Sequence, residues 1–164
     1  MAIVKTTFDL GKLGRGLDQI IANSMNQWGN RINKRIQDGV DSGTDIDGKA
    51  FEGLADVTKA LGGSKPLKRT GNMKKTKKLP STPKDFTFTI KMDGKSSRTG
   101  AFYGAFHNEG YTNSFKKKQW FKGAEIPPRK WFGISEELRP GGSELEKIVL
   151  YTHLQIEKKW RKGG

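Results

Sequence analysis

The chain has 164 residues, enough for one ordinary domain and too few for two. It contains no cysteine, so disulfides, thiolate metal sites and thiol catalysis are excluded. Its mean hydropathy of -0.73 is low and its net charge of +14 is high, but four Trp, nine Phe and three Tyr are too many large apolar side chains for a disordered coil.

The positive charge is concentrated in the C-terminal two thirds of the chain. Residues 1–56 carry seven Lys or Arg against eight Asp or Glu, whereas residues 57–164 carry twenty-four against nine. The stretch Val57–Lys84 has nine basic residues and no acidic one. A solvated cationic surface explains any single run of this kind, but an imbalance this large is typical of a protein with a polyanionic partner, most often nucleic acid.

No membrane partner is expected. Apolar runs such as Ile148–Tyr151 are far too short to span a bilayer. Met1–Leu10 has a single lysine and no apolar core of the kind found in secretory signals. We therefore expect a soluble protein in a reducing cytoplasm.

The N-terminal third predicts a long helix over residues 9–38. Asp9 can cap its start, and Gly39 stands where a glycine commonly follows a helix. Apolar residues recur at steps of three and four and keep to one face: Leu10, Leu13, Leu17, Ile20, Ile21, Met25, Trp28, Ile32 and Ile36.

The middle of the chain predicts loops, a short helical piece and a small sheet. Thr70–Lys78 is predicted as helical, with Thr70 as its cap. Apolar and polar residues alternate over Phe86–Met92, which predicts a strand with one buried face. The turn signal at Asp93 and Gly94 indicates a returning strand over Thr99–Phe102.

The C-terminal third predicts an extended proline-rich segment followed by two helices. A short helix begins at Ser135 and is ended by Pro140. A final helix over residues 143–161 has a capping box of Ser143 and Glu146. Its predicted buried face is formed by Leu145, Ile148, Val149, Thr152, Ile156 and Trp160.

These elements together predict an α+β fold: a long N-terminal helix, a small antiparallel sheet, a C-terminal helix and long irregular loops. We expect a single domain over residues 1–164, with the N-terminal helix at 9–38, a sheet and loop core at 50–134 and the C-terminal helix at 143–161.

The sequence lacks a recognisable catalytic or cofactor-binding constellation. His107 and His153 are far apart, and the glycine-rich stretch Leu10–Gly16 has neither the spacing nor the preceding strand of a phosphate-binding loop. A nuclease or a toxin would need a cluster of carboxylates or histidines that the sequence does not provide. We therefore expect no enzyme activity, no metal, no cofactor and no small-molecule substrate.

The basic region Lys65–Lys78 is the main candidate for contact with nucleic acid. Its lysines have short polar neighbours and no aromatic residue to stack on bases, which favours contacts with phosphates over reading of sequence. A solvated helix that balances an acidic partner subunit is the alternative. The candidate residues are Lys65, Lys68, Arg69, Lys74, Lys75, Lys77 and Lys78.

Aromatic residues around the proline-rich segment are candidates for a subunit interface. The basic loop Lys116–Lys118 is predicted to contact a neighbouring protein, and stacking on single-stranded nucleic acid through Trp120 is the alternative. Trp131 and Phe132 offer a large apolar surface either to the core or to a neighbour. The interface candidates are Phe115, Trp120, Phe121, Pro127, Pro128, Arg129, Trp131 and Phe132.

Four short motifs follow one another along the chain. Gly48–Leu54 precedes Thr58, and L-x-x-T-G-x-M spans Leu67–Met73. Tyr103–Gly110 and the segment I-P-P-R-K-W-F-G-I-S at Ile126–Ser135 complete the series. In this order the motifs resemble the phage virion morphogenesis, or tail completion, family typified by the G protein of phage Mu, over about residues 10–160.

Three features depart from the pattern of that family. Gly104 stands where alanine is usual, a basic insert lies between Gly110 and Ile126, and the Lys65–Lys78 region is strongly cationic. The basic insert and the Lys65–Lys78 region could both change which neighbouring protein the chain binds.

The resemblance implies a structural bacteriophage protein of the neck or tail end, active in tail completion and head–tail joining. Such a protein forms a homo-oligomeric ring, with six copies by analogy to tail symmetry, and borders the DNA path. It contacts neighbouring neck and tail proteins and double-stranded DNA without regard to sequence. It is located in the virion, and in the host cytoplasm during assembly. The alternative, drawn from charge alone, is a free-standing sequence-independent DNA-binding protein.

Overall fold

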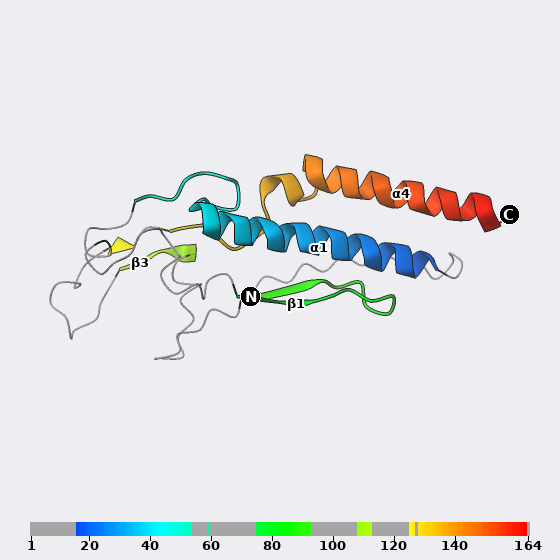
Figure 1. The fold of residues 1–164 in the computed structure, drawn as a ribbon, viewed down its shortest axis with the longest axis horizontal. Helices are drawn as coiled ribbons and strands as arrows, with labels where there is room; N and C mark the ends of the chain where they lie inside the picture. The colour runs from blue at the N-terminus through cyan, green and yellow to red at the C-terminus, as the bar shows by residue number, and fades with distance from the viewer. Residues whose placement is uncertain are drawn as a thin grey trace. The chain divides into compact units, whose positions relative to one another are not determined.

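The computed structural model describes residues 16–53, 59, 75–92, 108–112, 125–126 and 128–163. Its elements are the helices α1 (Leu17–Ser42) and α4 (Ser143–Gly163), the 3-10 helix η3 (Glu136–Leu138) and the strands β1 to β4, as Figure 1 shows. The contacts divide the chain into two compact units. Unit 1 is formed by Met1–Lys34, Lys77–Lys91 and Ile134–Gly164, and unit 2 by Arg35–Thr76 and Met92–Gly133.

Helix α1 has the apolar stripe that its sequence predicts, but the helix ends at Ser42, one turn after the predicted end at residue 38. Gly39 lies inside the helix, and Gly43, at a φ of 79°, is the residue that ends it. The amides of Gly43 and Thr44 both donate to the Gly39 carbonyl at 2.9 Å, which satisfies that terminal carbonyl. The extra turn buries Val40 completely. The predicted start at Asp9 lies outside the described residues. The buried stripe is Leu17, Ala22, Met25, Trp28, Ile32, Ile36 and Val40.

In unit 1, α4 lies beside α1 (Figure 1). Ile148 is buried, and the hydroxyl of Thr152 donates to Ser24 Oγ of α1 at 2.6 Å. Arg31 of α1 forms an ion pair with Glu144 in the first turn of α4. Of the predicted buried face, Val149 is instead 59 % exposed, and Leu145, Thr152 and Ile156 are half-buried.

The predicted capping box of α4 is wrong by one residue. The amide of Glu146 donates to the carbonyl of Gly142 at 3.0 Å, so Gly142 occupies the cap position that Ser143 was expected to take. A Cβ on Gly142 would overlap with the carbonyl oxygens of Glu136 and Glu137 in η3. The close approach of these two helices therefore requires glycine at the cap.

The short helix after the proline-rich segment is confirmed as η3, with Ser135 as its N-cap residue and Gly141 at a φ of 85° beyond it. Leu138 of η3 is buried. The indole Nε1–H of Trp28 donates to the Leu138 carbonyl at 2.9 Å. This hydrogen bond satisfies a buried carbonyl at the end of η3 and fixes η3 against α1.

Strands β1 (Thr76–Leu79) and β2 (Thr89–Met92) form a two-stranded sheet. The helix predicted over Thr70–Lys78 is wrong for its last three residues, which belong to β1, and its earlier part falls mainly outside the described residues. The predicted strand over Phe86–Met92 is a regular strand only from Thr89. The returning strand predicted at residues 99–102 lies outside the described residues, and β2 pairs with the preceding β1.

Unit 2 contains the last turns of α1, a tight loop and a second pair of strands. Strands β3 (Tyr111–Thr112) and β4 (Glu125–Ile126) are antiparallel, with Tyr111 opposite Ile126. In the loop after α1, the Asp45 carboxylate accepts from the amides of Asp47 and Lys49 at 2.9 and 2.8 Å. The side chain of Ile46 in this loop is buried. Two helices with small antiparallel pairings and long connections confirm the α+β fold class.

Gly29 provides a test of how the β1–β2 segment packs on α1. A Cβ on Gly29 would overlap with the ring of Phe88, so this ring lies directly on the helix backbone. Alanine in a helix is normally more stable than glycine by about 1 kcal/mol. At this position we expect the opposite sign, and Gly29→Ala should lower the free energy of unfolding by about 1–3 kcal/mol through overpacking.

The measurement is denaturant unfolding of a double-mutant cycle with Phe88→Ala. Removal of the ring frees the space above the helix, so Gly29→Ala should be neutral or stabilising in the Phe88→Ala background. A Gly29→Ala protein as stable as the wild type would contradict the packing of Phe88 on the helix.

Candidate nucleic-acid interface

The segment that carries β1 and β2 is attached to α1 by a pair of side-chain hydrogen bonds. The Asn26 amide group donates to the Ser81 carbonyl at 3.0 Å and accepts from the Ser81 amide at 2.8 Å. Ser81 itself is buried. Asn26 therefore satisfies both backbone groups of one residue and holds the connection between β1 and β2 against the helix, within unit 1.

The tip of this connection is a tight turn. Thr82 and Asp85 form an antiparallel bridge, with backbone hydrogen bonds of 2.8 and 3.0 Å in the two directions. The Asp85 carboxylate accepts from the amide of Thr87 at 3.0 Å, and Ser81 Oγ donates to the Asp85 carbonyl. The one acidic side chain of residues 77–91 is thus used to shape the turn.

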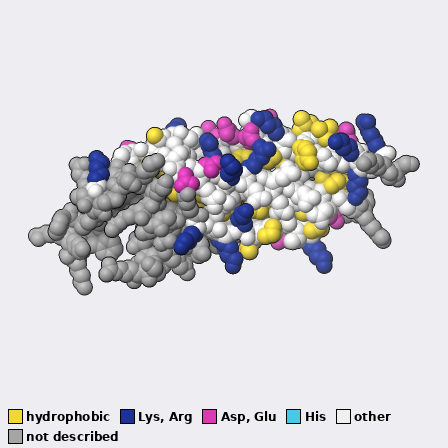
Figure 2. All heavy atoms as spheres, viewed as in Figure 1, with side chains coloured by type: hydrophobic (Ala, Val, Ile, Leu, Met, Phe, Trp, Pro, Cys, Tyr) yellow, Lys and Arg dark blue, Asp and Glu magenta, His cyan; other side chains and the backbone are white. Residues whose placement is uncertain are grey.

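Four lysines of this segment are exposed to solvent, namely Lys77, Lys78, Lys84 and Lys91, which we call the hairpin lysines. Lys78 Nζ donates to Asn30 Oδ1 of α1 at 3.1 Å. The side chains of the other three make no hydrogen bond or ion pair with any residue that the structure describes. Figure 2 shows Lys and Arg side chains that project from the lower edge of the molecule, where the β1–β2 segment lies in Figure 1.

The chemistry of these side chains suits phosphate contact. Three ammonium groups without a carboxylate partner among the described residues are available to replace the counterions of a polyanion. The aromatic residues of the same segment, Phe86 and Phe88, are half-buried, and Phe88 packs on α1, so it is not free to stack on a base. Cationic side chains without stacking aromatics favour binding that is independent of sequence.

The structure describes only part of the predicted basic region. Lys75, Lys77 and Lys78 are exposed. The remaining DNA-phosphate candidates, Lys65, Lys68, Arg69 and Lys74, lie outside the described residues. Lys84 and Lys91 were not among the candidates predicted from the sequence. The alternation of Phe86–Met92 predicts that Lys91 lies on the solvent face, and Lys84 lies between a proline and an aspartate, as is typical of a turn. Both lysines could therefore have been predicted as candidates from the sequence.

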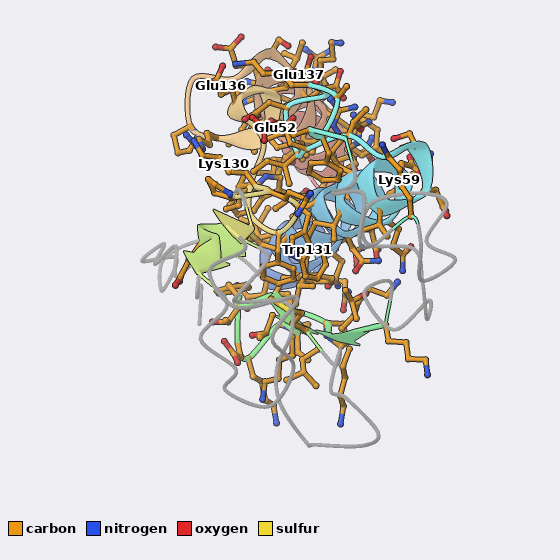
Figure 3. The ribbon with its side chains drawn as sticks, turned by 90° about the vertical axis from the view of Figure 1, so that its left-hand side faces the viewer. Glu52, Lys59, Lys130, Trp131, Glu136 and Glu137 are labelled. Atoms are coloured by element: carbon orange, nitrogen blue, oxygen red, sulfur yellow. The ribbon has the colours of Figure 1, made fainter. Side chains whose placement is uncertain are left out.

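Two of the four predicted subunit-interface residues that the structure describes are buried. Trp131 is 1 % exposed and Arg129 is 7 % exposed. Trp131 and its exposed neighbour Lys130 are labelled in Figure 3. Pro128 is exposed and Phe132 is half-buried, and their contact with a neighbour stays a prediction. Phe115, Trp120, Phe121 and Pro127 lie outside the described residues.

Two hydrogen bonds of the Ile46 backbone hold the segment that carries the buried Trp131. The Ile46 amide donates to the Lys130 carbonyl at 2.9 Å, and Arg35 Nε donates to the Ile46 carbonyl at the same distance. The ring of Phe132 meets Trp131 edge to face, with centroids 5.6 Å apart. The proline-rich segment is thereby tied to the loop after α1, and core packing is the alternative that the structure supports for Trp131.

The described residues carry scattered metal-ligating side chains. None of their His, Asp and Glu side chains form a group of three that could hold a metal ion. Lys147, which donates to Glu144 Oε1 at 2.8 Å, and Arg31 hold the pKa of the Glu144 carboxyl below its usual range. The largest cause of this lowered pKa is the hydrogen bond from Lys147 within α4, and the ion pair with Arg31 of α1 adds to it. Within the described part of the chain, no helix is long and apolar enough to cross a membrane.

Comparison with protein-family models, with curated proteins and with solved structures found no match. The resemblance to the tail completion family therefore rests on the sequence motifs alone.

The hairpin lysines can be tested by the salt dependence of DNA binding. Replacement of Lys77 and Lys84 by glutamine should weaken binding equally for unrelated duplex sequences. It should also lower the slope of log affinity against log salt concentration by about 0.9 for each phosphate that the protein no longer neutralises. Titration of fluorescent duplexes at several salt concentrations measures both quantities.

A charge-matched control is available in unit 2, where Lys49 and Lys130 are also exposed. Glutamine at both of these positions removes the same net charge and should leave the slope close to that of the wild type. An equal decrease of the slope in the two double variants would assign the binding to net charge rather than to the β1–β2 segment.

Proposed function

We propose that the chain is a non-enzymatic structural protein of a tailed bacteriophage that acts at the neck or tail end in tail completion and head–tail joining. In this proposal it assembles into a homo-oligomeric ring, with six copies by analogy to tail symmetry. The ring borders the path of double-stranded DNA and contacts neighbouring neck and tail proteins. It is a virion component, and before assembly it is in the host cytoplasm.

One observation carries the proposal: the four motifs occur in the order of the tail completion family at compatible spacing. The most specific of them is I-P-P-R-K-W-F-G-I-S at Ile126–Ser135. Its Arg129 and Trp131 are buried and its Ser135 precedes η3. A segment with these internal roles supports the idea that the motif belongs to a shared fold rather than to a chance run of residues.

The charges of the β1–β2 segment add a second, weaker line of support. Cationic side chains without aromatic partners tolerate DNA that moves past them, because they attract phosphates without holding individual bases. A protein that borders a DNA channel needs this kind of surface. A mechanical role also needs no arrangement of catalytic groups.

The same lysines favour a second candidate, a free-standing sequence-independent DNA-binding protein. The two functions differ in what the isolated chain does. A free-standing binder should form tight complexes with duplex DNA at moderate salt. A ring component should bind weakly as a single subunit and more tightly once many copies present their lysines together.

The decisive test is a phage genome from which the gene has been deleted. We expect full-length tails and DNA-filled heads that fail to join, because the missing subunit would seal the end where they meet. Electron microscopy of the lysate measures the fractions of joined particles, free heads and free tails. Purified protein added to the lysate should restore infectious particles.

Complementation with point variants separates assembly from DNA contact. The Lys49→Gln/Lys130→Gln variant should complement fully, because the proposal places the DNA contact in the β1–β2 segment and gives these two lysines no role. Deletion particles with intact necks and tails would falsify the proposal, and so would an isolated subunit that turned over a substrate.

A further inference from the structure

Helix α4 is apolar on two opposite sides. Its inner side faces α1 through Ile148 and Thr152. On its outer side Leu150 is 60 % exposed and Leu154 is 45 % exposed. Successive residues of a helix are about 100° apart, so Leu150 and Leu154 lie nearly opposite the inner face. Figure 2 shows hydrophobic side chains on the upper face, where α4 runs in Figure 1, with charged side chains around them.

The outer side has the spacing of a helix-pairing seam. Lys147, Leu150, Leu154 and Glu157 are separated by three, four and three residues, which is the a and d spacing of a coiled coil. The side chains of the two charged members are also accessible, at 67 % for Lys147 and 45 % for Glu157. Two apolar positions are thus flanked by one basic and one acidic position on the same face. Within the helix Lys147 pairs with Glu144 at 2.8 Å and Glu157 lies 3.2 Å from His153, so pairing between copies would have to compete with these exposed contacts.

The charges on this face are complementary between two copies only when their α4 helices run antiparallel. If two copies pair in parallel, each residue faces itself, so Lys147 meets Lys147 and Glu157 meets Glu157. If they pair antiparallel with Leu150 opposite Leu154, the same register places Lys147 opposite Glu157 at both ends of the seam. Opposite charges then flank two Leu–Leu layers, and the arrangement has the two-fold symmetry of an isologous contact.

The charges beyond the seam favour the same direction. Lys158, Lys159 and Arg161 lie near the C-terminal end of α4 and are exposed. Parallel pairing would bring two such clusters together. In the antiparallel register Lys158 of one copy is about twelve residues from Lys158 of the other along the helix axis, or roughly 18 Å. That separation exceeds the screening length of about 8 Å at physiological salt.

We propose that the outer side of α4 is the contact between two copies of this chain, paired antiparallel across Leu150 and Leu154. The inference is independent of the virion role, since it concerns only what this surface binds. An isologous contact closes on two copies, so in solution it gives a dimer, and a ring would need a different, heterologous contact. Two Leu–Leu layers form a short seam, so the association is expected to depend strongly on concentration.

Sedimentation of the full chain over a concentration series tests the contact. Wild-type protein should shift from monomer to dimer as the concentration rises, and Leu150→Ser/Leu154→Ser should stay monomeric. Both side chains are exposed in the subunit, so the fold should be kept, which circular dichroism checks. The matched control is Val149→Ser, which removes an equally exposed apolar side chain outside the seam and should leave the dimer intact.

Charge reversal tests the register. Lys147→Glu places two acidic residues opposite each other at both ends of the seam, and Glu157→Lys places two basic ones there, so each variant alone should dimerise less than the wild type. A mixture of the two variants should form heterodimers, because Glu then faces Lys at both ends. The double variant Lys147→Glu/Glu157→Lys should behave as the wild type.

Because the chain has no cysteine, single introduced cysteines report the direction of pairing. Tyr151 lies one residue from the two-fold axis of the antiparallel register, so Tyr151→Cys should form a disulfide-linked dimer under oxidation. Lys147→Cys should not, since the two copies of that position are roughly 15 Å apart along the axis. Equal cross-linking at both positions, or a wild-type protein that stays monomeric at every concentration, overturns the proposal.

Discussion

The apolar stripe of α1 is the constraint on which the rest of unit 1 depends. Between Ser24 and Arg31 this one helix contacts three separate parts of the chain: α4 through Ser24 and Arg31, the β1–β2 connection through Asn26, and η3 through Trp28. The buried stripe provides the apolar surface of the helix, and the hydrogen bonds of Ser24, Asn26 and Trp28 fix the positions of the segments that contact it. The hairpin lysines and the outer side of α4 are placed on the surface by these contacts.

The sequence predicts the elements whose signals are local. The periodicity of α1 and α4 comes from apolar residues repeated over many turns, and it predicts both helices. Helix α1 ends one turn later than predicted, and its predicted start lies outside the described residues. Strand β1 was missed because Thr76–Leu79 has no apolar alternation, and its strand conformation depends on pairing with β2. The cap of α4 moved to Gly142 because η3 approaches closely, and the end of α1 moved because Val40 is buried. Neither tertiary contact is visible in a local pattern.

In the candidate sites too, features with a local signal could be predicted from the sequence, and features that depend on tertiary contacts could not. Exposed lysines could be predicted because charged side chains are rarely buried, and Lys75, Lys77 and Lys78 are exposed. The role of Trp131 could not be decided from the sequence, because an aromatic residue in an extended segment packs equally well inside a subunit or between subunits. Its burial depends on the loop that carries Ile46, which lies far away in the sequence. The exposed side of α4 was hidden by the assumption that a helix has one apolar face, which Leu150 and Leu154 contradict.

Charge places a further condition on any assembly of this protein. A chain with a net charge of +14 repels its own copies, so a stable contact between copies must either pair charges or bring in a polyanion. The outer side of α4 meets the first condition, since its basic and acidic positions alternate and pair in one direction only. The hairpin lysines meet the second, since they are exposed and none of the described carboxylates pairs with them. The two surfaces lie on different elements of unit 1, so the protein can bind a second copy and a phosphate backbone without competition between the same side chains.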